Sequence, residues 1–232
     1  MKRIQNICAV DSCFLCNNCL DEWKPAILAH KTTYKIKKGE IIFKEGDPVT
    51  GIYFVNSGSV KVYKKWDKDK ELIVRFARQG SLFGHRGLGI GGIYPISAAA
   101  VETAVVCYVD VAFFEASLKV NPDFTYKLLM FLTEELKQSE RKMRNLAHMS
   151  VKGRVAEALI SLQNQFGITD DGFINIDLSR QDLASYAGAT YETVFRMMNE
   201  LVSEKLIGLS GKSIRLIHHN KLLKLAQDVV FL

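Results

Sequence analysis

The chain has 232 residues, of which 48% are hydrophobic and 24% are charged, and its formal net charge is +6. This is an ordinary globular composition, long enough for two compact domains. No run of 18 apolar residues occurs, and the first residues, MKRIQNICAV, lack the apolar core of a signal peptide. A membrane-spanning or secreted chain is therefore excluded, and we expect a cytoplasmic protein without a membrane partner.

Four cysteines are crowded into the N-terminal segment CAVDSCFLCNNC, namely Cys8, Cys13, Cys16 and Cys19. The CxxC spacing lets two thiolates approach one metal, and four thiolates suit tetrahedral zinc or an iron–sulfur cluster. Such crowding is not typical of an extracellular disulfide framework. The segment therefore predicts an iron–sulfur site, a zinc site or a thiol redox site, and the spacing leaves these alternatives open.

Short apolar runs alternate with glycine turns from Tyr34 to Val109. The predicted strands are Lys35–Phe43, Ile52–Val55, Val60–Tyr63, Leu72–Phe76 and Val101–Val109. The sequence NSGS between the second and third of these runs is a hairpin signal, and the whole pattern favours a barrel or jelly-roll-like sheet structure. His85 stands among several glycines, which predicts a flexible loop and leaves heme ligation as one alternative for this side chain.

A long helix is predicted at Asn121-Pro122-Asp123, with Asn121 as its candidate cap and Pro122 at its first position. Its apolar seam has 3 and 4 spacing and consists of Leu129, Leu132, Leu136, Ser139, Met143, Leu146 and Ser150. Such a seam predicts a coiled coil between two copies of the chain, although packing on its own domain is the alternative. Glu134, Glu135 and Glu140 are expected on the solvated surface of this helix, and Lys152-Gly153-Arg154 is expected to form a hinge.

Two short helices are predicted next, joined by a tight turn. Ser179 can cap the first helix, which ends at Gly188, and Thr190 can cap the second, which runs from Tyr191 to Glu204. The second helix has an apolar face made of Val194, Met197, Met198, Leu201 and Val202. This pattern, followed by a hairpin of Leu206–Leu209 and Ser213–Ile217, is typical of a winged helix-turn-helix. A short strand is also expected at Phe173–Leu178, and a terminal helix within the run from His218 to Leu232.

The other face of the second helix has side chains that could read base edges. Arg196 can donate two hydrogen bonds to guanine, and Glu192 can accept one from cytosine, although a simple pair of neighbouring charges is the alternative. The candidate DNA contacts are Ser179, Arg180, Thr190, Tyr191, Glu192, Thr193, Phe195, Arg196 and Lys212. Residues 150–232 contain nine basic and nine acidic side chains, so this prediction depends on placement and not on bulk charge.

The segment LSRQDLASYAGATYETVFR, from Leu178 to Arg196, resembles the Crp/Fnr superfamily of bacterial transcription regulators, and KKGEIIFKEGD and IYFVNSGSVKVY resemble its β-roll. The resemblance implies an α+β fold with a cysteine-rich segment (1–24), a cyclic-nucleotide-binding-like β-roll (25–120), a dimerisation helix (121–150) and a winged helix-turn-helix (151–232). It also implies double-stranded DNA, a second copy of the chain and RNA polymerase as partners, and no enzymatic activity. Glu192 and Arg196 match the residues that read a TGA-type half-site, whereas Tyr191 and Phe195 depart from common members.

The resemblance also suggests the signal. Fnr-type members hold an oxygen-labile [4Fe-4S] cluster through three N-terminal cysteines and a distant one. By position these would be Cys13, Cys16, Cys19 and Cys107, with Cys8 as an alternative, although the spacing departs from the family and Cys107 could be a small hydrophobic strand residue. We therefore expect control by oxygen, nitric oxide or redox state.

Cyclic-nucleotide-binding members have a Glu after Phe83-Gly84 and an Arg near Ser97. Here His85 follows Gly84, and no Arg stands in Tyr94-Pro95-Ile96-Ser97, which argues against cyclic AMP because a buried phosphate needs its cation. The candidate effector-pocket residues are Phe83, Gly84, His85 and Ser97. The alternative function is a sensory binding protein that responds to a small molecule, either a cyclic nucleotide or heme.

Overall fold

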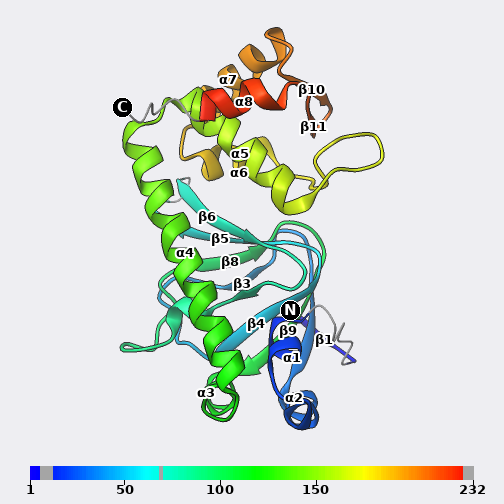
Figure 1. Cartoon of the computed structure of the whole chain (residues 1–232), viewed down its shortest axis with the longest axis vertical. Coiled ribbons are helices and arrows are strands. Elements are labelled where there is room, and N and C mark those ends of the chain that lie inside the picture. Colours follow the sequence, from blue (N-terminus) through cyan, green and yellow to red (C-terminus); the bar gives the residue numbers. More distant parts are fainter. Residues whose placement is uncertain (6–12, 68–69, 227–232) are drawn as a thin grey trace. The chain divides into compact units, whose positions relative to one another are not determined.

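The structure is a computed structural model that describes residues 1–5, 13–67 and 70–226 (Figure 1). The chain divides into two compact units, Met1–Leu136 and Lys137–Leu232. The division falls inside the long helix α4 (Pro122–His148), so the expected cysteine segment, β-roll and start of the dimerisation helix share the first unit. Cys8 lies outside the described residues.

Two antiparallel sheets form most of the first unit (Figure 1). Among the described residues, one sheet has the strand order β1 (Lys2–Ile4), β2 (Thr32–Ile36), β9 (Ala104–Asp110), β4 (Gly51–Ser57), β7 (Leu82–Phe83). The other has the order β3 (Ile41–Phe43), β8 (Ser97–Ala100), β5 (Val60–Lys65), β6 (Glu71–Ala77). The predicted β-roll is therefore present.

The sequence prediction located most of these strands and missed three of them. The NSGS segment connects β4 to β5, with Gly58 at a φ of +76°. The hairpin predicted there is wrong, because β4 pairs with β7 and β9 whereas β5 pairs with β6 and β8 in the other sheet. The strands β1, β7 and β8 were not predicted, and the run Lys35–Phe43 predicted as one strand is divided between β2 and β3 in different sheets. β8 reads SAAA and is buried along its whole length, so it has no alternation of polar and apolar residues to indicate a strand.

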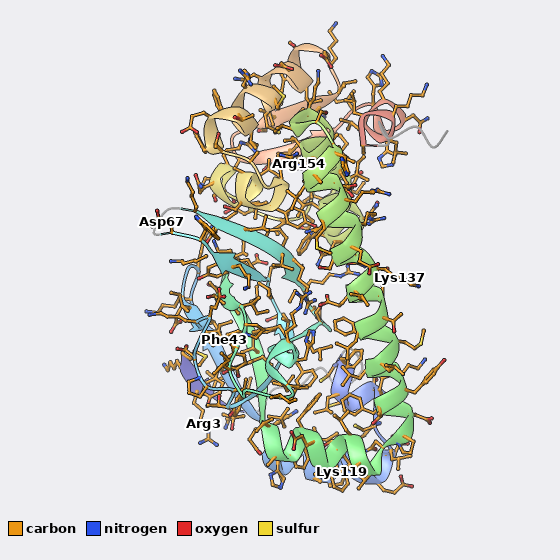
Figure 2. All side chains as sticks on the ribbon, turned by 90° about the vertical axis from the view of Figure 1, so that its left-hand side faces the viewer. Arg3, Phe43, Asp67, Lys119, Lys137 and Arg154 are labelled. Carbon is orange, nitrogen blue, oxygen red and sulfur yellow. The ribbon has the colours of Figure 1, made fainter. Side chains whose placement is uncertain are left out.

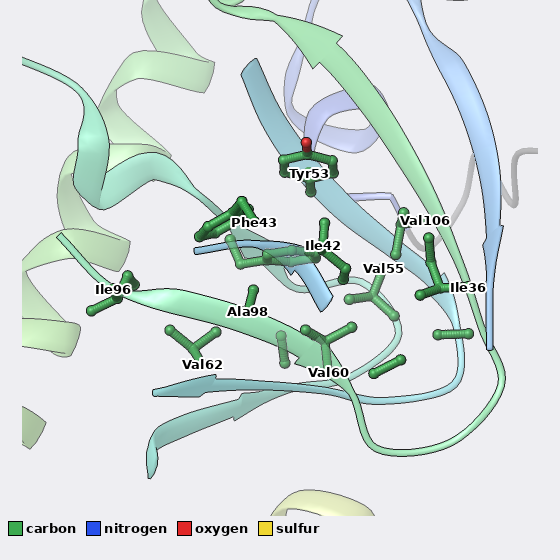
Figure 3. Close-up of a cluster of buried hydrophobic side chains, with 14 of the residues drawn as sticks. Ile36, Ile42, Phe43, Tyr53, Val55, Val60, Val62, Ile96, Ala98 and Val106 are labelled. Atoms are coloured by element: carbon green, nitrogen blue, oxygen red, sulfur yellow. The ribbon is translucent and has the colours of Figure 1, made fainter. Parts of the chain in front are cut away.

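One hydrophobic core lies between the two sheets (Figure 3). Strand residues from both sheets point into it, including Ile36, Val55, Val60, Val62 and Val106. Aromatic rings fill the end of this core nearest β7. Phe43 stacks on Tyr94 at 3.9 Å between ring centroids, and Tyr53 stacks on Phe83 at 5.2 Å. Packing of this kind stabilises the roll through burial of apolar surface.

The cysteine-rich segment forms short helices docked on the first unit: α1 (Phe14–Asn18), η2 (Asp21–Trp23) and α2 (Lys24–His30). Two long-range hydrogen bonds fix them. The Trp23 indole donates to Ser117 Oγ of α3 (Val111–Val120) at 3.0 Å, and the backbone N–H of Leu20 donates to Asn121 Oδ1 at 2.8 Å. The side chain of Asn121 therefore anchors this segment. It does not act as the predicted cap of α4, because its Oδ1 accepts the hydrogen bond from Leu20.

Helix α4 begins at Pro122, as predicted, and ends at His148. Two expectations about its end are wrong. Ser150 is not part of the seam, because it caps the next helix, α5 (Val151–Phe166), by accepting a hydrogen bond from Gly153 N. The segment Lys152-Gly153-Arg154 is not a hinge, because all three residues lie in the first turn of α5.

The second unit contains α5, α6 (Arg180–Ala187), α7 (Tyr191–Ser203), the hairpin of β10 (Ile207–Ser210) and β11 (Ser213–Leu216), and α8 (His219–Ala226). Helix α5 packs against α6, α7 and α8. The predicted winged helix-turn-helix is thus present. The strand predicted at Phe173–Leu178 is absent from the described residues, where Ile174 forms only an isolated bridge with Ile168. The predicted terminal helix beyond residue 226 lies outside the described residues.

Candidate nucleic-acid interface and cysteine cluster

Side-chain caps start both helices of the helix-turn-helix. Ser179 Oγ accepts a hydrogen bond from Asp182 N at 3.0 Å at the start of α6, and Thr190 Oγ1 accepts one from Thr193 N at 3.3 Å at the start of α7. Gly188 ends α6 in the left-handed conformation, with φ of +65°. The left-handed conformation at this position favours glycine, because glycine has no Cβ. The predicted turn is therefore confirmed.

Arg154, labelled in Figure 2, lies on α5 and contacts this turn. Its guanidinium donates to the carbonyl oxygens of Ala187 at 3.0 Å, Met149 at 2.8 Å and Gly188 at 3.3 Å. These carbonyls lie at the ends of helices, where they lack partners within the helix. Sequence reasoning missed this role, because the contact with the turn spans more than thirty residues of sequence.

Helix α7 has one buried and one exposed face. Val194, Met197, Met198 and Leu201 are buried in the second unit, whereas Val202, predicted on the same face, is 37% exposed. Thr190, Tyr191, Glu192, Phe195 and Arg196 are exposed. Among the described residues Glu192 and Arg196 form no ion pair with each other. Their charged groups are thus available to a partner outside the chain.

Arg180 and Lys212 link this surface to the wing. The Arg180 guanidinium is partly buried and donates to Gly211 O at 3.2 Å, in the turn between β10 and β11. Lys212, next to that carbonyl, is exposed. The structure therefore brings α6, α7 and the wing turn together, while Ser179 and Thr193 act in the caps and are partly buried.

Two family models match the chain: a cyclic nucleotide-binding domain at residues 34–121 and a Crp-like helix-turn-helix domain at residues 153–225. Together they span more than two thirds of the sequence. The chain belongs to the Crp/Fnr superfamily. It is accordingly a DNA-binding transcription regulator, and its relatives are regulators and not enzymes.

Individual relatives support this assignment. The chain is 29% identical over 198 residues to the cAMP-activated global transcriptional regulator CRP of Salmonella typhimurium, covering 83% of this chain and 91% of the relative. It is 28% identical over 194 residues to the transcriptional activator protein anr of Pseudomonas aeruginosa, covering 82% and 79%. The solved structure of FixK2 from Bradyrhizobium japonicum superposes with a TM-score of 0.75 at 28% identity, covering 84% of this chain and 96% of that one.

Four cysteines of this Crp/Fnr regulator share one buried cluster. Cys13 precedes α1, Cys16 lies within it, Cys19 follows it, and Cys107 lies on β9. All four are less than 9% exposed and pack in one apolar cluster with the side chains of Leu15, Ile27, Ile52, Phe54, Leu82, Val109, Phe113, Phe114, Phe124 and Leu128. Thr33 Oγ1 lies 3.9 Å from Cys107 Sγ. Residues that are far apart in sequence therefore meet in one hydrophobic region.

Four thiols are the possible metal donors of this cluster. Among the described residues, no group of three or more His, Cys, Asp or Glu side chains is arranged to hold a metal ion. An iron–sulfur cluster is ligated by cysteine thiolates, each on its own iron, and four buried thiols in one region match that donor chemistry. Burial raises the pKa of the Cys19 thiol to about 12, and the nearby Cys13 adds to this effect.

The predicted effector residues have partners within the first unit. Phe83 is buried in the aromatic stack, and Ser97 Oγ accepts a hydrogen bond from Glu45 N at 2.9 Å. Gly84 has φ of +90°, and a Cβ there would meet Gly51 O at 3.3 Å. His85 is buried, contrary to the flexible loop expected from its glycine neighbours. Its ring packs edge-on against Phe131 of α4 at 5.3 Å.

The carboxylate of Glu135 on α4 contacts Arg75 of β6 and two side chains of the turn η3 (His85–Gly87). Its carboxylate oxygens lie 3.1 Å from Arg75 Nε, 2.9 Å from Arg86 Nη2 and 3.5 Å from His85 Nε2. Burial alone would raise the pKa of Glu135, but its contacts with His85, Arg75 and Arg86 outweigh burial and hold that pKa at about 2. The expectation that Glu135 lies on a solvated surface is wrong, and no local pattern in the sequence could have identified its partners.

No helix in the described ranges combines the length and the apolar character that crossing a membrane requires.

Proposed function

We propose that this regulator senses oxygen, nitric oxide or a related oxidant through Cys13, Cys16, Cys19 and Cys107, and that it binds a palindromic DNA site as a homodimer. The supporting observation is the common burial of the four cysteines, because Cys107 is 88 residues from Cys19 in sequence and yet packs in the same cluster. Packing of the fold alone would not require a thiol at each of the four positions.

The four cysteines would be the ligands of an iron–sulfur cluster, which would supply oxygen-labile redox chemistry when bound. The apolar side chains around them exclude water from the site. Ligation requires thiolates, so Cys19, whose pKa burial raises to about 12, must release a proton when it becomes a ligand. Assembly of the site is therefore coupled to a change of charge inside the first unit.

Helix α4 is the element through which such a change would act. Phe14, between Cys13 and Cys16, packs against Phe124 at 6.0 Å and Phe131 at 5.7 Å between ring centroids, and both rings belong to α4. Any movement of α1 must repack these contacts, because protein interiors have few voids. We infer that the signal shifts the population between two positions of α4.

The exposed side of α4 supports homodimerisation. Leu129, Leu132 and Leu136 are 58%, 41% and 59% exposed in the first unit, and Met143 and Leu146 continue the same spacing along the helix in the second. Exposed leucines at seam spacing need a partner helix. In such a dimer two copies of α7 would read successive half-sites, with Glu192 and Arg196 contacting base edges. RNA polymerase would be the further partner.

We infer that cyclic AMP is not the signal. The aromatic rings of Phe43, Tyr53, Phe83 and Tyr94 stack on one another inside the roll, and the side chains of Phe83 and Ser97 already have partners there. His85, in the position of a ribose-binding Glu, faces Glu135 and Phe131. A nucleotide phosphate would then lack a cation beside Ser97.

Anaerobic purification followed by visible absorption and iron and sulfide assays tests the proposal. We expect a coloured protein with a broad absorption that air removes, together with DNA binding that changes on exposure to air. Cys107→Ser should lose the iron, whereas the matched control Cys8→Ser should keep it if Cys8 is not a ligand. A colourless protein free of iron would contradict the cluster, and a sharp Soret band would instead favour heme.

A further inference from the structure

Tyr191 and Phe195 form an exposed aromatic pair on α7. Their ring centroids lie 6.1 Å apart with an angle of 15° between the planes, and the two residues are 41% and 50% exposed. They are one helical turn apart, on the same face. Two large rings held together in water expose apolar surface that a partner would bury with a gain in free energy.

The pair lies beside the charged residues of the same helix. With about 100° of rotation per residue, Phe195 is about 60° around the helix axis from Glu192 and about 100° from Arg196. The buried face of Val194, Met197, Met198 and Leu201 occupies the opposite side. A helix seated in the major groove with Glu192 and Arg196 toward base edges would therefore turn Phe195 toward a neighbouring base pair.

Tyr191 is itself held in position. Its ring stacks on that of Phe195, one turn along the same helix. The two rings therefore support each other on the exposed face of α7. The orientation of the pair is set before a partner arrives, which reduces the entropy lost on binding.

We propose that Phe195, braced by Tyr191, contacts the 5-methyl group of a thymine next to the bases read by Glu192 and Arg196, so that each half-site requires thymine at that position. This rests on the proposed role of α7 as the reading helix. A phenyl ring has no hydrogen-bonding group for a base edge, and thymine alone among the four bases presents a methyl group in the major groove. Apolar contact with that methyl is the interaction that a ring at this place can make.

The test replaces the methyl group alone. A DNA site is first selected from a random pool with the full-length protein under anaerobic conditions. Each thymine of the selected site is then replaced in turn by deoxyuridine, which differs only by the missing methyl, and the Kd is measured. Burial of one methyl group predicts about a fourfold weaker Kd for one half-site, and about fifteenfold when both half-sites are changed.

Matched variants assign the effect to Phe195. In Phe195→Ala the ratio of uridine to thymine Kd should fall to about one, whereas Tyr191→Phe, which keeps the stacked ring, should retain it. Arg196→Ala should weaken binding and relax a different base position while leaving the ratio unchanged. Circular dichroism checks that each variant is folded, which we expect because these side chains are exposed.

The outcomes separate the two proposals. If the protein binds a selected site but every uridine replacement is neutral, or if the ratio persists in Phe195→Ala, the methyl contact is wrong while the reading role of α7 stands. If the full-length protein selects no sequence from the pool, the proposed role of α7 and this inference both fail.

Discussion

Glu135 and Arg75 face each other inside the first unit, with 3.1 Å between Oε1 and Nε and little exposure of either side chain. Sixty residues separate them in sequence, and the pair joins α4 to β6. The Arg75 guanidinium also lies 5.5 Å from the ring centroid of Phe131, one turn before Glu135 on α4. Phe131 in turn contacts Phe14 of the cysteine segment. The cysteine segment, the charged cluster and the dimerisation helix are therefore in physical contact.

Replacing Glu135 by Gln should destabilise the protein by about 3 kcal/mol, because it leaves Arg75 buried without its counter-charge. Urea unfolding followed by circular dichroism measures the change. Glu140→Gln, on an exposed position of the same helix, serves as the control and should change stability by less than about 0.5 kcal/mol. Equal losses of stability from the two substitutions would show that the buried Glu135–Arg75 pair contributes no more than an exposed side chain does.

Stability should fall on acidification in two steps. The folded-state pKa of His85 lies below its ordinary value because of burial, so the unfolded chain binds the proton more readily, and stability decreases as the pH falls below about 6.5. The pKa of Glu135 is about 2 in the folded state, so its contribution is present above its ordinary pKa and is lost as the pH falls from about 4.5 toward 2.

Unfolding free energies measured from about pH 7 to about pH 2 check this. His85→Gln should flatten the upper step while keeping the lower one. The groups around His85 are Arg75 on β6, Arg86 beside it, and Glu135 and Phe131 on α4. If the upper step in stability were unchanged in His85→Gln, a group other than His85 would be responsible for that loss of stability.

Arg154→Ala should loosen the turn between α6 and α7, because the carbonyl oxygens of Ala187 and Gly188 in that turn lose their donor. The carbonyl oxygen of Met149, before α5, loses its donor as well. We expect about 2 kcal/mol of destabilisation, and weaker DNA binding as the orientation of α7 becomes less fixed. Urea unfolding and a gel-shift assay measure the two effects. Lys152→Ala, which removes the exposed contact with Glu204, is the control and should cost less than about 1 kcal/mol.

Cys19 should resist alkylation in the folded, metal-free protein. With its pKa raised to about 12 from an ordinary value of 9.0, its thiolate fraction at neutral pH falls about a thousandfold. Peptide mass spectrometry after iodoacetamide treatment should find Cys19 unlabelled in buffer and labelled in concentrated urea. Rapid labelling without urea would mean that the cluster of thiols opens readily in solution.

Leu136→Glu should convert the dimer into a monomer, because it places a charge in the exposed seam of α4, where Leu136 is 59% exposed. Analytical ultracentrifugation measures the mass, and DNA affinity should fall with it. The control is Lys137→Glu at the neighbouring position, which also makes the local charge more negative and should leave the dimer intact. A wild-type protein that sediments as a monomer would contradict the proposed homodimer directly.

The sequence by itself determined the features that depend on neighbouring residues. Caps at Ser179 and Thr190, the left-handed Gly188 and the start of α4 at Pro122 all follow from local hydrogen bonding and backbone sterics. The buried face of α7 follows from helical periodicity in the same way.

Only the tertiary structure decided what depends on contacts between distant residues. The clamp from Arg154, the burial of His85 and Glu135, and the meeting of Cys107 with the N-terminal cysteines have no local pattern, because each partner is chosen by how the sheets and helices pack. Strand β8, buried throughout, likewise becomes a strand through its neighbours β3 and β5 and not through its own periodicity.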